Sequence, residues 1–348
     1  MTSAKATQHR DWIAKYGVGI ALAALVLLAA ISVPGFFSRT NLTTVLLHVS
    51  VNAILALGIT FVIVTAGIDL SVGSVVGLAG VLVAATVTSA GVLNSAGVFG
   101  ATVLAVGVGL GTGAIIGLAN GAVISYLRVA PFMVTLAMMT MARGAARLFT
   151  GGVPIGFPAT DDPSFSLKVS ALDMLNKLGG GRIPVPGLPR GFPVPALIML
   201  LLVMTAAFVL TRTKFGRHVY AVGGNEEAAR LSGVPVRRVK LGVYAISGAC
   251  AGLAAVLMVG QLRSGGPDAG MLYELNAIAA AVIGGASLFG GLGTAWGALI
   301  GALLIGVLNN ALDLLGVQAF WQEISKGGII LAAVLFDVWT KRGKTNAS

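Results

Sequence analysis

Long apolar runs separated by short polar breaks dominate the chain. Runs of about 20 apolar residues match the thickness of a bilayer core when they form helices. Such runs fall near residues 17–33, 46–66, 70–90, 98–126, 131–149, 194–211, 241–262, 275–290, 293–315 and 323–340. The breaks at 66–70 and 290–293 are so short that each neighbouring pair could be a hairpin or one broken helix. The pattern predicts an all-α, polytopic membrane protein with about ten transmembrane helices.

The composition supports a membrane protein. Of the 348 residues, 56% are hydrophobic and 10% are charged, whereas a soluble domain carries about 25% charged residues. The net charge of +11 comes largely from basic residues that flank the apolar runs, so it predicts contacts with membrane lipid and not with nucleic acid. The single Cys250 and three separated histidines (His9, His48 and His218) offer no disulfide and no metal site.

Two polar loops set the expected orientation. The loop at 211–240 and both chain ends are rich in lysine and arginine, and with ten spans they share one face. Positive charge assigns that face to the cytoplasm. The loop at 150–193 then lies outside; it holds most of the prolines and no positive excess. We expect an ordered external cap with short helices, such as one at 170–178, although a disordered linker is the alternative.

Glycines recur at every fourth position in several parts of the chain. Examples are Gly109, Gly113, Gly117 and Gly121; Gly293, Gly297 and Gly301; and Gly73 with Gly77. In lipid, small residues at this spacing let helices pack closely, and surfaces that slide during gating are the alternative. The triplet Asn-Ala-Ile occurs before each short break, at 52–54 and at 276–278, which suggests an internal repeat of the kind found in transporters.

Several polar side chains lie in or between apolar runs, where a buried polar group needs a partner. The candidates for a polar route are Asn52, Asp69, Ser71, Asn120, Thr135, Asn309 and Asn310. Two readings of Asp69 stay open, because it could cap the next helix or line the route. The amides could likewise bridge helices or contact a hydroxyl-rich solute. Arg143 and Arg147 are expected to snorkel to the interface, and Glu274 and Glu323 suit helix N-termini.

A short helical segment lies inside the basic loop at 211–240. Glu227-Ala228-Ala229 is followed, three residues later, by Gly233, a helix stop. This could be a docking element for a soluble partner or a solvated, capped helix without one. The chain has no G-x-x-x-x-G-K-S/T phosphate loop and no hydrolase motif, so we expect no enzymatic activity and no cofactor in this chain.

Four segments together resemble the permease subunits of bacterial ATP-binding cassette importers for monosaccharides, in the branch for ribose, xylose and autoinducer-2. They are AGIDLSVGS at 66–74, VGGNEEAARLSG at 222–233, AVIGGASLFGG at 281–291 and GVLNN at 306–310. Importer permeases of this class carry a cytoplasmic EAA-x-x-x-G motif. Glu227, Ala228, Ala229 and Gly233 match that motif.

The resemblance implies a type II importer-like fold in one permease domain, residues 1–348, in the bacterial cytoplasmic membrane with both termini cytoplasmic. It implies three partners: a cytoplasmic ATP-binding subunit, a periplasmic or lipid-anchored sugar-binding protein, and a second permease copy, identical or paralogous. The 211–240 loop then couples to the ATPase through Gly224, Asn225, Glu226, Glu227, Ala228, Ala229, Arg230, Ser232 and Gly233.

Two rival functions remain open. An ion-coupled secondary transporter would need paired intramembrane charges, and Asp69 is the one candidate, without an obvious partner. A membrane scaffold or receptor would need no set of buried amides.

Overall fold

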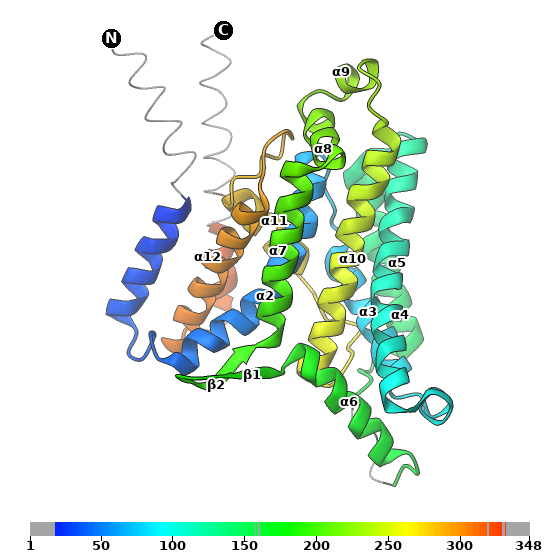
Figure 1. Ribbon diagram of the computed structural model, residues 1–348, viewed down its shortest axis with the longest axis vertical. Helices are drawn as coiled ribbons and strands as arrows, with labels where there is room; N and C mark the ends of the chain where they lie inside the picture. The colour runs from blue at the N-terminus through cyan, green and yellow to red at the C-terminus, as the bar shows by residue number, and fades with distance from the viewer. Residues whose placement is uncertain (1–17, 157, 159–160, 319, 329–330, 332–348) are drawn as a thin grey trace.

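The apolar runs form helices that stand side by side (Figure 1). The computed structural model describes residues 18–156, 158, 161–318, 320–328 and 331. A first helix, Val18–Ser32, is followed by α2 (Arg39–Val64), α3 (Val72–Val87), α4 (Ala90–Tyr126), α5 (Pro131–Thr150), α7 (Val194–Arg212), α10 (Val236–Leu262), α11 (Tyr273–Ile283) and α12 (Ala295–Leu314), with a further helical segment at 320–328. Each predicted run therefore has a helix. Most of the 323–340 run and the basic residues of both chain ends lie outside the described residues.

Five of these helices, α2, α4, α7, α10 and α12, are long and apolar enough to cross a membrane, and Val18–Ser32, α3 and α11 are shorter apolar helices. Helix α2 is central, because 89% of its most apolar window is buried. The predicted all-α, polytopic membrane class is confirmed.

Helix boundaries differ from the prediction where glycine ends a helix early. The run at 275–290 is helical only to Ile283, because Gly284, Gly285, Gly290 and Gly291 follow and three of them have positive φ. At the other break, α2 ends at Val64 and α3 begins at Val72. Both short breaks are thus loops between separate helices.

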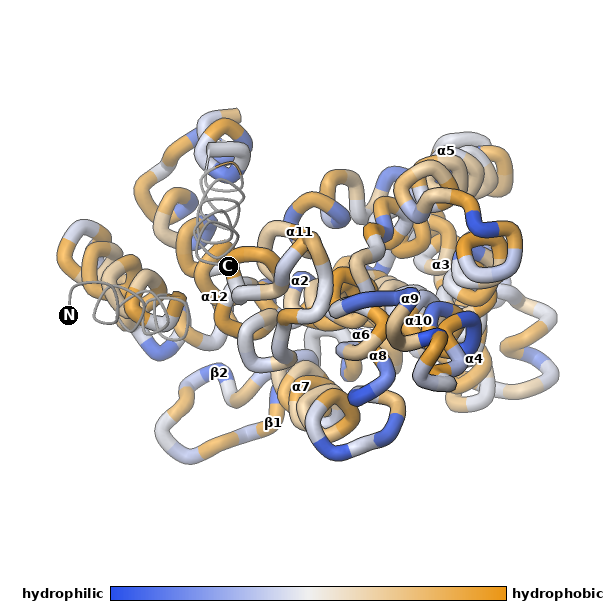
Figure 2. Tube along the Cα trace, turned by 90° about the horizontal axis from the view of Figure 1, so that it is seen from above, coloured by the Kyte–Doolittle hydropathy of each residue, from blue (hydrophilic) through white to orange (hydrophobic). Residues whose placement is uncertain are grey.

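The two long polar loops lie at opposite ends of the helical bundle (Figure 1). Helices α8 (Lys214–Gly224) and α9 (Glu226–Leu231) occupy one end. At the other end are α6 (Phe165–Gly179) and an antiparallel hairpin of β1 (Arg182–Val185) and β2 (Leu188–Pro193), with Ile183 paired to Phe192. Seen from above, hydrophilic residues gather around α9 and the start of α10 (Figure 2).

The loop at 150–193 is ordered, as predicted, but more elaborate than expected. Helix α6 starts earlier than the predicted 170–178 helix and buries Ala171, Leu172 and Leu175 against residues of α3, α4 and α10. Asn176 Nδ2 donates to the carbonyl oxygen of Gly260, 2.7 Å away. The hairpin was not predicted, because its proline-rich strands lack the alternation that marks a sheet.

Glycine faces bring helices into backbone contact. A Cβ atom on Gly113 would overlap the carbonyl oxygen of Gly248, and one on Gly252 would overlap that of Gly109. The main chains of α4 and α10 are therefore in direct contact at these glycines. Gly297 and Gly301 play the same role between α12 and α11. Gly73 and Gly77 were predicted to pack against another helix, but they instead leave space for the side chains of Glu274 and Arg143 and for the loop at 267–270.

Candidate functional site

Helix α9 is a short helix with both ends fixed by local chemistry. Asn225 Oδ1 accepts the backbone N–H of Ala228 at 2.9 Å, which caps the N-terminus. Glu226 and Glu227 in the first turn and Arg230 in the last complement the helix dipole. Gly233 then adopts a φ of +82°, the left-handed stop for which glycine is best suited. Both ends of α9 are therefore set by residues within or next to the helix.

Most side chains of α9 are exposed to solvent. Only Ala229 is buried, whereas Glu227, Ala228 and Ser232 are exposed and Leu231 is 81% exposed. Two ion pairs brace the helix: Glu227 with Arg230, and Glu226 Oε2 with Lys240 Nζ at 2.7 Å. A helix of six residues would not persist alone in water, so caps and ion pairs are needed to present its exposed face.

Helix α8 connects α9 to the interior of the bundle. A Cβ atom on Gly223 would overlap the carbonyl oxygen of Val64 and lie 2.6 Å from the nitrogen of Gly291. Gly291 N–H itself donates to Val64 O at 2.9 Å. The hydroxyl of Tyr220 donates to Gly293 O at 2.7 Å, and burial raises the pKa of Tyr220, so this donor stays protonated.

The last turn of α8 therefore touches the last residue of α2, where the first break begins, and the second break at 290–293. We call this meeting point of Val64, Gly223 and Gly291 the glycine joint. Sequence reasoning missed it, although the paired glycines at 223–224 and 290–291 were its signal. The two breaks, each preceded by an Asn-Ala-Ile triplet, also contact each other here. A Cβ on Gly290 would lie 2.9 Å from the Cβ of Ala66.

Four of the predicted route residues meet at the first break. Asp69 Oδ1 accepts the N–H of Ser71 at 3.0 Å and its hydroxyl at 2.6 Å, and Asp69 Oδ2 accepts the Ser247 hydroxyl at 2.9 Å. Asn120 Nδ2 donates to Ser71 Oγ at 3.0 Å. Asp69 and Asn120 are both buried. The cluster joins the break to α4 and α10.

The cap that Asp69 could offer to α3 is not formed. Ser71 is the N-cap residue, but its side chain makes no bond to the first turn. Asp69 instead binds the N–H of Ser71 itself, which closes a turn ahead of the helix. Thr135 is buried at the same place, with its hydroxyl 3.0 Å from Pro131 O and 3.4 Å from Ile68 O.

The remaining three candidates lie apart from this cluster. Asn310 pairs with Asn41 through two reciprocal side-chain hydrogen bonds, of 2.8 and 2.9 Å, and so bridges α12 and α2. The side-chain oxygens of Asn52 and Asn309 are buried and have no hydrogen-bond partner among the described residues. These two buried acceptors are left unpaired within the described part of the chain.

Arg143 does not reach out to solvent as expected, whereas the side chain of Arg147 is half-exposed, as snorkelling predicts. Arg143 Nη1 donates to the carbonyl oxygens of Pro267 and Ala269, at 2.7 and 2.8 Å, and Arg147 pairs with Asp268 at 2.7 Å. The loop between α10 and α11 offers free carbonyls within reach of α5, and satisfying them is favoured over solvent exposure. Glu274 lies in the first turn of α11, as expected.

Comparison with known proteins identifies the family. The family model for the permease component of branched-chain amino acid transport systems matches residues 41–334. The chain belongs to this permease family. The match runs from the start of α2 past α12, so it includes the glycine joint, the Asp69 cluster and α9.

Curated relatives of this permease have sugar-importer names. The ribose import permease protein of Escherichia coli (strain K12) is 41% identical over 328 residues, 94% of this chain and 95% of the relative. That of Bacillus subtilis (strain 168) is 42% identical over 323 residues, 93% and 92% of the two chains. The xylose transport system permease protein of Haemophilus influenzae is 34% identical over 366 residues, 93% and 96% of the two chains. The resemblance inferred from the sequence motifs is confirmed.

Proposed function

We propose that this permease imports a monosaccharide across the cytoplasmic membrane as the membrane-spanning subunit of an ATP-binding cassette importer. Ribose is the first candidate cargo, because relatives that match almost the whole chain are named for it. The observation that carries the coupling role is α9, an exposed helix with fixed ends and the EAA-x-x-x-G motif. ATP hydrolysis belongs to a partner chain.

In this proposal, the ATP-binding subunit docks on the exposed side of α9, around Glu227, Ala228 and Leu231. Movement of α9 passes through α8 to the glycine joint, which contacts the breaks before α3 and before α12. The helices on both sides of each break then rock between outward-open and inward-open states. The end with α9 and both chain termini face the cytoplasm, and α6 with the hairpin receives the sugar-binding protein outside.

Two copies of the permease, identical or paralogous, surround the sugar route in this proposal. Asn52 and Asn309 contact the sugar, since their buried oxygens can accept hydrogen bonds from its hydroxyls. The Asp69, Ser71, Asn120 and Thr135 cluster holds the first break in shape, and Asn310 holds α12 to α2.

The test is uptake of labelled ribose by cells that lack their own ribose and xylose permeases and express this chain with its ATPase and binding protein. Glu227→Lys and Gly233→Asp should abolish uptake at unchanged membrane levels, because each disrupts α9. Full uptake in both variants would contradict the coupling role.

Two competitors separate the cargo alternatives. Unlabelled ribose should suppress uptake and leucine should not; the reverse result would favour a branched-chain amino acid, the cargo in the family's description. Uptake that needs no ATPase and collapses with a protonophore would favour the ion-coupled transporter instead.

A further inference from the structure

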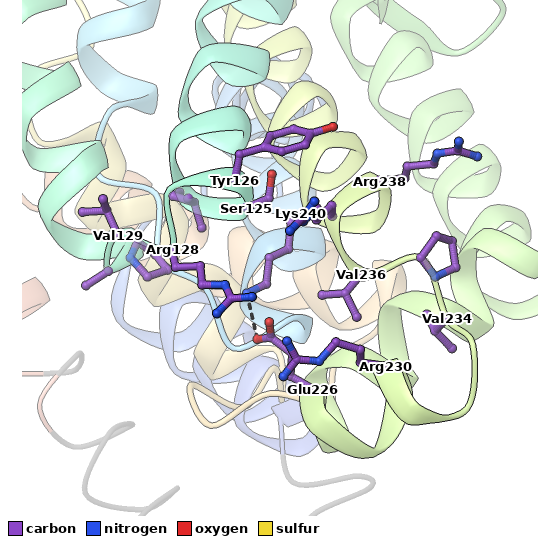
Figure 3. Close-up of a pocket in the computed structure, with 15 residues that line it drawn as sticks. Ser125, Tyr126, Arg128, Val129, Glu226, Arg230, Val234, Val236, Arg238 and Lys240 are labelled. Carbon is purple, nitrogen blue, oxygen red and sulfur yellow. Dashed lines mark hydrogen bonds and ion pairs between the residues drawn. The ribbon is translucent and has the colours of Figure 1, made fainter.

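A basic groove of about 900 Å³ lies beside α9 (Figure 3). It is lined by the end of α4, the 128–130 loop, the first residue of α5, α9 and the first turns of α10. These helix ends share the end of the bundle that carries α9 (Figure 1). In a membrane-spanning bundle, such helix ends mark the boundary between hydrocarbon and water.

The groove carries a strong excess of positive charge. Five cationic side chains line it, Arg128, Arg230, Arg237, Arg238 and Lys240, against the single carboxylate of Glu226. Lys240 and Arg230 are already paired, with Glu226 and Glu227, and Arg237 lies 5.4 Å above the ring of Tyr126. Arg128 and Arg238 have no carboxylate partner within the described part of the chain.

Two helix N-termini add to this positive field. Helix α5 follows Ala130, and α10 follows Pro235; neither helix start has a side-chain cap or an acidic residue in its first turn. Both starts line the groove. Pro131 has no N–H, and the N–H groups of Met133 and Val236 are bonded within the chain, so it is the positive dipole ends of the two helices that favour an anion.

Ser125 independently indicates a missing ligand. Its residue is only 7% exposed, it lines the groove, and its hydroxyl has no partner among the described residues. Elsewhere in this chain, helical hydroxyls bond the carbonyl four residues earlier, as in Thr86 and Thr102. An unbonded buried hydroxyl is costly unless something in the groove accepts from it.

Exposed apolar side chains stand next in sequence to the groove-lining residues at the turn between α4 and α5. Leu127 is 69% exposed and Met133 is 58% exposed, and Phe132 lies between Met133 and the groove-lining Pro131. A small soluble anion would leave these apolar side chains exposed, whereas the acyl chains of a lipid would bury them.

We propose that this groove binds the phosphate of an anionic phospholipid headgroup, with the acyl chains lying along Leu127, Phe132 and Met133. The Ser125 hydroxyl and the two helix N-termini contact the phosphate, and Arg128 and Arg238 supply the unpaired positive charge. Because Arg230 belongs to α9 and Lys240 pairs with Glu226 of α9, the bound lipid stabilises the helix on which the ATPase docks in the proposed function. The proposal is independent of the cargo.

The experiment is native mass spectrometry of the purified full-length chain in detergent, incubated with phosphatidylglycerol or with phosphatidylcholine of the same acyl length. The wild type should retain phosphatidylglycerol preferentially. The Arg128→Ala/Arg238→Ala double variant should lose about tenfold or more of that retention, since each cation near an anionic lipid contributes a severalfold effect. Ser125→Ala should weaken retention without removing charge.

The matched control is Arg212→Ala/Arg217→Ala, which removes two exposed arginines from the same end of the chain but outside the groove. If the control variant lost as much lipid as the groove variant, the proposed site would be wrong, because unspecific attraction of the lipid to positive charge would explain the retention. Displacement of the lipid by millimolar inorganic phosphate would overturn the lipid as occupant. So would a groove variant with normal lipid retention but weak ATPase binding, which would assign the groove to an acidic segment of that subunit.

Discussion

Single residues at the ends of α9 decide whether the proposed docking surface forms. The helix is too short to form by propensity, and its only buried side chain is Ala229. Because little side-chain packing stabilises the helix, the cap from Asn225 at its start and the left-handed Gly233 after its end fix where it begins and stops. The sequence made these residues predictable, because caps and left-handed stops depend on neighbours within a few positions.

The first prediction concerns the cap. Asn225→Ala removes the acceptor for the Ala228 N–H and should destabilise α9 by about 1 kcal/mol. We expect the ATPase to co-purify severalfold less well and ribose uptake to fall in proportion. Asn225→Asp keeps a capping oxygen and serves as the control. Equal loss in both variants would mean that the amide itself, and not the cap, contacts the partner.

The second prediction concerns the glycine joint. Gly223→Ala places a methyl group against the carbonyl oxygen of Val64, so α8 must move away from the first break. We expect normal docking of the ATPase but strongly reduced uptake. Gly144→Ala in α5 is the matched control, because it lies outside the loop at 211–240 and a Cβ there meets nothing within 4 Å. Uptake unaffected by Gly223→Ala would rule out transmission through this joint.

At the scale of elements, glycine determines how closely helices approach. In α4, the series at 109, 113, 117 and 121 faces α10, whose own Gly248 and Gly252 face back. Lipid provides no hydrophobic drive between helices, so this close contact is the main source of their association. Sequence spacing predicted the packing face of α4, but not that α10 is its partner.

The third prediction tests that face. Gly113→Ala overlaps the carbonyl oxygen of Gly248 and should destabilise the fold by about 1–3 kcal/mol. Gly111→Ala, on the open side of the same helix, should be neutral or slightly stabilising because alanine favours helix. Thermal unfolding in detergent should show a lower apparent Tm for the first variant only. A shared decrease would point to helix flexibility and not to packing.

At the scale of the whole molecule, the chain has two distinct ends. One presents α8, α9 and most of the loop charge; the other presents α6 and the hairpin (Figures 1 and 2). Hydrophobic runs and loop composition were enough to place the two loops on opposite faces. Long-range contacts were not predictable, since Ser247 binds Asp69 from 178 positions away and Pro267 binds Arg143 from 124 positions away.

The fourth prediction fixes the orientation. The native Cys250 is buried, so a membrane-impermeant maleimide should leave the wild type unlabelled. Leu231→Cys on α9 should be labelled only in inside-out vesicles, and Val185→Cys on the hairpin only in intact spheroplasts. The opposite pattern would reverse the assignment of the cytoplasmic face, and would exclude α9 as the ATPase docking site.

The glycine joint is built almost entirely from main-chain atoms. The carbonyl of Val64, the Cα of Gly223 and the amide of Gly291 meet there without any side chain that could distinguish one solute from another. If Asn52 and Asn309 line the sugar route as proposed, substitutions there that change the preferred sugar leave these atoms untouched. A lineage can therefore diversify its cargo while inheriting the same mechanical linkage unchanged.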